Sequence, residues 1–183
     1  MGGLVATFCA SLLNSLGPGV VIAPFVEEVL KVAGVVVVLR IFGVGTPIRG
    51  FVVGYLVGAA FECYENFLYI ASPDDPYGSV AEAFAALPVR ILLGFGLHAA
   101  ATAMTGAAVA YTLGQSGRVL GRVSIGVLLL AIGIHLVWDL ATVAGIAGYA
   151  LMALDYAVLV ALFLVTRKRA LAASKRMSGG RPS

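Results

Sequence analysis

The stretch APFVEEVLK, residues 23–31, places Glu27, Glu28 and Lys31 inside an apolar run. The run covers residues 20–42, which is long enough for one helix to cross a lipid bilayer. A charged side chain near the middle of such a helix costs about 2.5–3.5 kcal/mol on insertion scales. Because ionisable residues kept at that cost usually serve a function, this stretch predicts a reaction site buried in a membrane.

Spacing within the stretch predicts one ion pair. Glu27 and Lys31 are four residues apart, so a helix places them on the same face, where they share the cost of burial. Glu28 lies one position further round the helix, and we expect it to have no local partner. An ionisable group kept at that cost usually has a function, so we expect one for this carboxylate.

The composition is that of a polytopic membrane protein. The 183 residues are 61% hydrophobic and only 11% charged, with a mean hydropathy of +1.02. No glycine-rich phosphate-binding loop or nucleic-acid motif is present, so we expect the lipid bilayer, and no nucleic acid, as a partner.

The apolar runs predict an all-α fold, a polytopic transmembrane helical bundle of about five full spans with a short N-terminal apolar helix. Residues 1–19 form the short N-terminal apolar segment, residues 20–166 the transmembrane core, and residues 167–183 a basic tail that we expect to be disordered. The predicted full spans cover residues 20–42, 50–70, 87–113, 123–144 and 149–166.

Loop charges predict the orientation. If the spans alternate in direction, the opposite side carries a loop at residues 71–86 with Asp74, Asp75 and Glu82. The positive-inside rule then predicts a cytoplasmic C-terminus and an extracytoplasmic acidic loop. The basic residues that share one side are Arg40, Arg49, Arg118, Arg122, Arg167, Lys168, Arg169, Lys175, Arg176 and Arg181.

Polar residues of the later spans lie on faces suited to helix contact. Steps of four join Gly50, Gly54, Gly58, Glu62 and Asn66, with Glu65 beside Glu62, and likewise Arg90, Gly94, His98, Thr102 and Gly106. His135 and Asp139 are also four apart, so the carboxylate is expected to orient the imidazole. Asp155 stands alone on the last span, where we expect a packing or interface residue.

Depth in the membrane gives an independent indication. At about 1.5 Å per residue, the acidic and histidine side chains of the first four spans lie about 8–17 Å below the outer surface. Helices of alternating direction need not match in this way. The match predicts one polar cavity that opens outward and is walled by the first four spans.

The motifs carry a resemblance to a known family. They are Glu27-Glu28-x-x-Lys31, Phe61-Glu62-x-x-Glu65-Asn66, His98-x-x-x-Thr102-x-x-x-Gly106 and His135-x-x-Trp138-Asp139. In order and spacing they resemble the PrsW family of intramembrane proteases, which is related to the CAAX prenyl proteases and bacterial Abi proteins. The resemblance covers residues 23–139. It implies a protein of the cytoplasmic membrane of a bacterium or archaeon. It also implies cleavage of a membrane-anchored protein, such as an anti-sigma factor in stress signalling, near its extracytoplasmic end.

Two forms of the chemistry stay open. Either Glu27 or Glu28 takes a proton from water as general base, while His98 or His135 stabilises the oxyanion and protonates the leaving amine. Alternatively, the histidines bind a metal such as zinc, together with a carboxylate such as Glu65. The sequence lacks the His-Glu-x-x-His motif, which leaves the metal undecided. Residues expected to support the site are Lys31, Glu62, Asn66, Arg90, Thr102 and Asp139.

Two other functions fit buried ionisable residues. A small ion- or proton-coupled transporter would relay ions along them, although carriers often contain internal repeats and none is visible here. A non-catalytic membrane scaffold would keep its ion pairs but tolerate the change Glu28→Gln.

Overall fold

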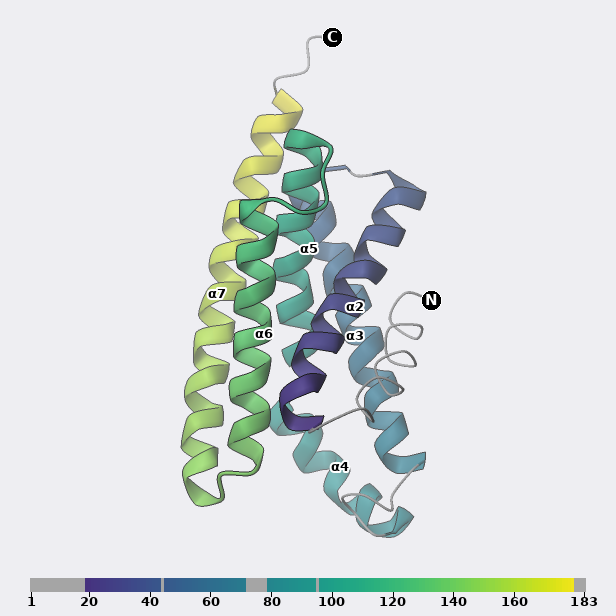
Figure 1. Cartoon of the computed structure of the whole chain (residues 1–183), viewed down its shortest axis with the longest axis vertical. Coiled ribbons are helices and arrows are strands. Elements are labelled where there is room, and N and C mark those ends of the chain that lie inside the picture. The colour runs from purple at the N-terminus through teal and green to yellow at the C-terminus, as the bar shows by residue number, and fades with distance from the viewer. Residues whose placement is uncertain (1–18, 44, 72–78, 95, 180–183) are drawn as a thin grey trace.

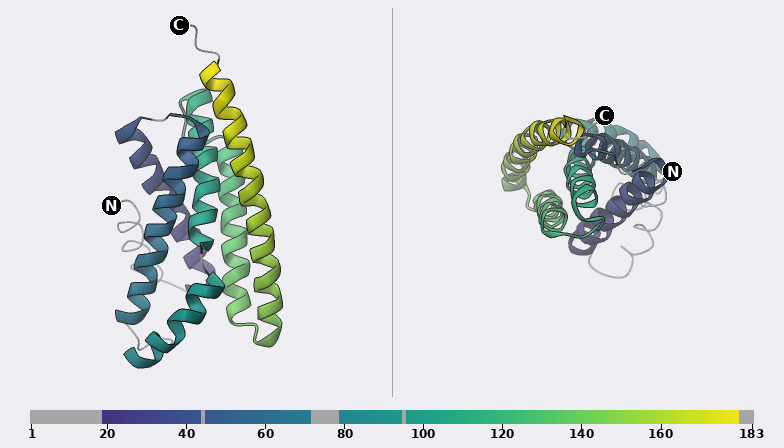
Figure 2. Two further views of the ribbon diagram at one scale, coloured as in Figure 1. Left: turned by 180° about the vertical axis from the view of Figure 1, so that it is seen from behind. Right: turned by 90° about the horizontal axis from the view of Figure 1, so that it is seen from above.

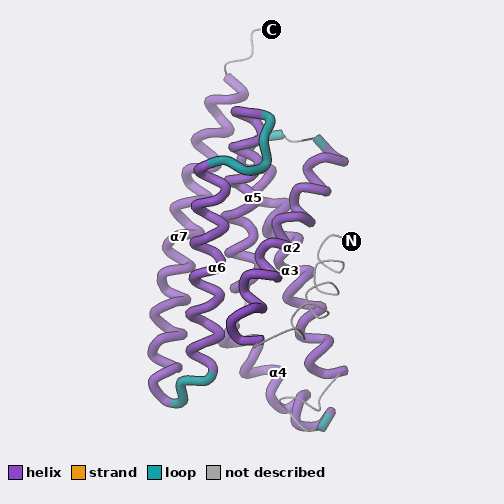
Figure 3. The backbone as a smooth tube through the Cα atoms, viewed as in Figure 1, coloured by secondary structure: helices purple, strands orange, loops and turns teal. Residues whose placement is uncertain are grey.

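The computed structural model is a bundle of α-helices and describes residues 19–43, 45–71, 79–94 and 96–179 (Figure 1). No strand occurs among these residues, so the all-α class is confirmed (Figure 3). The predicted apolar helix near the N-terminus falls outside the described residues. The helices are α2 (Gly19–Phe42), α3 (Pro47–Ala71), α4 (Val80–Gly94), α5 (Leu97–Ser116), α6 (Arg122–Thr142) and α7 (Ile146–Gly179).

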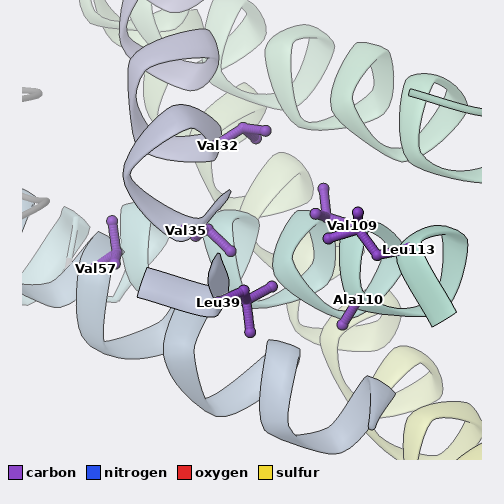
Figure 4. Close-up of a cluster of buried hydrophobic side chains, with 7 residues drawn as sticks. All are labelled: Val32, Val35, Leu39, Val57, Val109, Ala110 and Leu113. Atoms are coloured by element: carbon purple, nitrogen blue, oxygen red, sulfur yellow. The ribbon is translucent and has the colours of Figure 1, made fainter. Parts of the chain in front are cut away.

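Helix α5 is the centre of the bundle, and it contacts α2, α3, α6 and α7 (Figure 2). Its sequence is rich in alanine, glycine and threonine, and nearly every residue from Leu97 to Leu113 is buried. Small side chains let neighbouring helices approach this axis closely. On the side of α2 and α3 the buried apolar residues are Val32, Val35, Leu39, Val57, Val109, Ala110 and Leu113 (Figure 4).

Glycines of α3 allow its backbone to lie in direct contact with the backbone of α5. A Cβ atom added to Gly54 would lie 2.1 Å from the carbonyl oxygen of Thr102, and one added to Gly58 would lie 2.3 Å from that of His98. Since real Cβ atoms never approach a carbonyl so closely, only glycine fits at these positions. The predicted glycine face of α3 is therefore confirmed, and it brings the next turns of α3 beside the start of α5.

The predicted third span is wrong in one respect, because residues 87–113 do not form one helix. α4 ends at Gly94 and α5 begins at Leu97, with Gly96 between them at a φ of 78°. Left-handed backbone favours glycine, and glycine is a poor helix former, so the sequence Gly-Phe-Gly breaks the helix here. His98 consequently lies in the first turn of α5, and Arg90 belongs to α4, a different helix.

The basic tail is also different from the prediction, because residues 167–179 are helical rather than disordered. They continue α7, which has 34 residues and is longer than a bilayer core of about 30 Å requires. Alanine, leucine, lysine and arginine in this segment favour a helix. The buried hydroxyl of Ser174 accepts a hydrogen bond of 3.0 Å from the backbone N–H of Ile48, which attaches the segment to α3.

The basic connections lie at one end of the bundle, as alternating helices require. The α2–α3 and α5–α6 connections share this end with the C-terminal end of α7 (Figure 1). The α6–α7 turn and α4 lie at the other end. The side chains of Arg40, Arg49, Arg118 and Arg122 are all exposed at the basic end.

Two helices are by themselves long and apolar enough to cross a membrane, among the residues described. They are α6 and the segment Ile146–Met177 of α7. The helices α2 and α3 have comparable lengths of 24 and 25 residues but carry the buried acidic residues. The count of five spans therefore stays a prediction.

The close contact of α3 with α5 can be tested with Gly54→Ala. The added methyl group overpacks the contact, so we expect the free energy of unfolding to fall by about 1–3 kcal/mol. Gly133→Ala on α6 is the matched control, since a Cβ there meets nothing within 4 Å. Unfolding of both variants in one detergent measures the difference, and equal stabilities would contradict the contact.

Candidate active site

Ionisable side chains from α2, α3, α5 and α6 meet in the interior, in the part of the bundle away from the basic end. Each comes from the portion of its helix that antiparallel packing brings to this level. The predicted gathering of these residues from separate helices agrees with this arrangement, and a cavity that opens outward stays a prediction. The clustered residues are Glu27, Glu28, Lys31, Glu62, Glu65, His98, His135 and Asp139.

Lys31 connects most of the cluster. Its Nζ lies 2.5 Å from Glu28 Oε1 and 2.7 Å from His98 Nδ1, and it stands 4.6 Å above the ring of Phe61. The side chains of Lys31 and Glu28 are both completely buried. The expectation that Glu28 has no local partner is therefore wrong, because residues three apart also face each other on a helix. The pairing of Lys31 with Glu27 stays a prediction.

His135 is surrounded by carboxylates. Its Nδ1 lies 3.1 Å from Glu28 Oε1, and its Nε2 lies 3.6 Å from Asp139 Oδ1 and 3.8 Å from Glu27 Oε2. The contact with Asp139 is the one that the four-residue spacing predicted. The contacts with Glu27 and Glu28 join α6 to α2.

His98 is held at both ring nitrogens. Since an ammonium group can only donate, Nδ1 of His98 accepts from Lys31, and the proton of the neutral ring then lies on Nε2. Nε2 is 2.9 Å from Glu65 Oε2, to which it donates. The rings of His98 and His135 meet edge to face with their centroids 4.9 Å apart. The two histidines are therefore neighbours with fixed orientations.

Glu62 has a positional role that the sequence did not reveal. Its Oε1 accepts a hydrogen bond of 2.9 Å from the backbone N–H of Gly96, at the break between α4 and α5. This bond fixes the start of α5 and with it the position of His98. The signal in the sequence was the pair of glycines around Phe95, inside an otherwise apolar run.

The remaining predicted residues lie at different distances from the cluster of ionisable side chains. Thr102 is completely buried on α5, one turn beyond His98. Asn66 lies on α3, one turn beyond Glu62, and is partly buried. Arg90 lies on α4, and its side chain is outside what the structure describes. The sequence did not indicate that Phe61 would face Lys31.

Negative charge exceeds positive charge in the described cluster. Its acidic residues outnumber its only lysine, and Oε2 of Glu28 and of Glu62 are buried without a hydrogen-bond partner in the described part of the chain. A buried carboxylate oxygen without a partner is costly. The cluster therefore has the chemistry of a site that takes up a cation.

Glu27, His98 and His135 form the group that could hold a metal ion. All three are buried, and their ligand atoms lie within 4.8 Å of one another. Two imidazoles and one carboxylate are a ligand set of catalytic zinc sites, so these residue types fit a metal. His98 would bind it through the ring nitrogen that faces Lys31 or Glu65, in place of that contact. Glu65 is the acidic ligand that the sequence suggests, and this role stays a prediction. Glu65 hydrogen-bonds His98, as carboxylates commonly do when they orient a metal-binding histidine.

The connecting role of Lys31 can be tested with Lys31→Met. Removing the ammonium leaves Glu28 as a buried carboxylate without its cation, so we expect a loss of about 3–5 kcal/mol in the free energy of unfolding. The double variant Glu28→Gln/Lys31→Met removes both charges and should recover part of this loss. Unfolding of the two variants measures the coupling, and a double variant no more stable than Lys31→Met would contradict the pair.

Comparison with known proteins gives one match. The family model for PrsW family intramembrane metalloproteases matches residues 1–166. No curated protein and no solved structure matches the chain. The match spans every residue of the cluster, and its description as a metalloprotease family implies a metal. The chain belongs to the PrsW family of intramembrane metalloproteases.

Proposed function

We propose that this intramembrane protease hydrolyses a peptide bond of a membrane-anchored protein near the extracytoplasmic side, at the cluster of Glu27, Glu28, His98 and His135. One observation carries the proposal. Two histidines from different helices are in contact, and a third helix places Glu27 within 4.8 Å of the ligand atoms of both. Such a convergence of buried titratable groups is typical of a reaction centre.

Glu27, His98 and His135 would hold the metal. A metal ion supplies a Lewis acid that polarises the scissile carbonyl and makes water a stronger nucleophile. Its charge would offset the excess of carboxylates in the described cluster. Zinc suits this ligand set best, since imidazole and carboxylate are its usual ligands together with thiolate.

Glu28 is the better candidate for the general base. Its Oε1 is held by Lys31 and His135, whereas its buried Oε2 has no hydrogen-bond partner in the described residues. Oε2 can therefore accept a proton from water while the water oxygen attacks the carbonyl carbon. The same oxygen then returns the proton to the leaving amine, and Glu28 is restored.

The surrounding residues would keep these groups in place. Lys31 fixes Glu28 and accounts for the tautomer of His98, whose other nitrogen is held by Glu65. Asp139 approaches His135 from the next turn of α6. Preorganised polar groups of this kind need no rearrangement when charge develops in the transition state.

The membrane arrangement supports a cut near the outer surface. We take α2, α3, α5, α6 and α7 as the spans and place the basic end in the cytoplasm by the positive-inside rule. The cluster then lies in the outer part of the bundle, within reach of the outer surface. A membrane-anchored substrate, such as an anti-sigma factor, would present its extracytoplasmic end at this depth.

The role of Glu28 is tested by Glu28→Gln, which keeps the shape of the side chain but removes the base. We expect cleavage to fall about 10²–10⁴-fold, the usual contribution of a general base. The measurement is cleavage of an epitope-tagged candidate anti-sigma factor, co-reconstituted with the purified protease in liposomes.

Glu82→Gln is the control, because it changes an exposed glutamate that caps the start of α4 by its contact with Ser79. This variant should cleave at the wild-type rate. Cleavage by Glu28→Gln at the same rate as the control would show that Glu28 is not the base.

A further inference from the structure

Asp155 of α7 is a buried carboxylate that the proposed mechanism does not use. Its side chain is only 7% exposed, and its Oδ2 is buried without a hydrogen-bond partner among the described residues. A packing or interface residue, as the sequence suggested, would not need a charge at this position. An unpartnered carboxylate in the interior is costly, so some group absent from the protein chain is expected to compensate it.

The α6–α7 hairpin places Asp155 at the level of His135. His135 lies eight residues before Val143, and Asp155 lies ten residues after Gly145, with the turn between them. At about 1.5 Å per residue, the two positions differ in height by only about 3 Å. The helices run side by side along the bundle in both side views (Figures 1 and 2).

Neighbouring residues show that Asp155 lies on an inward face of α7. Leu159, one turn further along, is buried in a cluster with Leu97 of α5 and Ile134 of α6, and Tyr156 packs against this cluster. Asp155 is close enough to His135 for the charges of the two groups to interact. The carboxylate therefore belongs to the surroundings of the histidine.

The groups around His135 are otherwise acidic. Glu28, Glu27 and Asp139 contact its ring from α2 and α6, and Lys31 is the nearest ammonium group. One more carboxylate on the α7 side makes this region more negative. That addition is unfavourable for the protein alone and favourable when a cation is bound at His135.

We propose that Asp155 is a positioning residue of the metal site, which strengthens the binding of a divalent cation by His135 from the side of α7. The proposal rests on the proposed function, since it assumes the site formed by Glu27, His98 and His135. The ring of His135 contacts other carboxylates, so Asp155 would act through its charge, which attracts a cation bound at this site.

The experiment is a titration of the purified full-length protein in detergent with Zn²⁺, in competition with a chelating dye. For Asp155→Asn we expect the Kd for Zn²⁺ to rise about 10–100-fold, because a negative charge close to a divalent cation is lost. Asp155→Glu keeps the charge and should stay within about 3-fold of the wild type, well below that loss. Glu82→Gln, which removes an exposed carboxylate on α4, should leave the Kd unchanged.

Thermal unfolding of the metal-free variants separates this role from a structural one. Asn has the shape of Asp without its charge, so we expect Asp155→Asn to unfold at the wild-type temperature or higher. An unchanged Kd for Asp155→Asn would overturn the inference while leaving the proposed metal site intact. If the wild type does not bind Zn²⁺, the metal site and the inference both fall. If Asp155→Asn and Asp155→Ala both fail to fold at saturating Zn²⁺, Asp155 serves the fold and the inference is overturned.

Discussion

The buried ammonium of Lys31 is the interaction on which the rest of the site depends. It contacts Glu28 on its own helix, His98 on α5 and the ring of Phe61 on α3, and Glu28 in turn contacts His135 on α6. A positive charge in the interior of a membrane protein is stable only with such partners. Because His98 and Phe61 come from other helices, the lysine fixes their positions relative to α2.

The glycine contact between α3 and α5 provides the precision that this arrangement needs. Gly54 and Gly58 bring the two backbones together, and the next turns of α3 then carry Glu62 to Gly96 and Glu65 to His98. Larger residues at the glycine positions would separate the helices and lengthen both hydrogen bonds. The same close approach that stabilises the bundle therefore orients one of the two histidines.

Much of the fold could be predicted because apolar runs and glycine steps are local signals. The bounds of α2, α3 and α6 follow the apolar runs closely. The break at Gly96 was missed because hydropathy averages over a window, and two glycines in an apolar run do not lower it enough. The residues of the C-terminal segment favour a helix, but its high charge is typical of disorder, and its attachment to Ile48 is not visible in the sequence.

The candidate site was predictable in its membership but not in its pairing. Motif spacing identified the glutamates and histidines, and it predicted the contact of His135 with Asp139. The contact of Lys31 with His98 joins two helices, so only the folded chain reveals it. The group that could hold a metal contains Glu27, which motif spacing did not single out over Glu65, since ligand sets are determined by tertiary contacts.

X-ray absorption at the zinc edge of the purified, zinc-loaded protein tests the central claim most directly. We predict one zinc ion per chain with nitrogen and oxygen ligands, including two imidazoles, and loss of this ion in His135→Ala. An ion bound equally well by His135→Ala, or one without imidazole ligands, would contradict the assignment of the site.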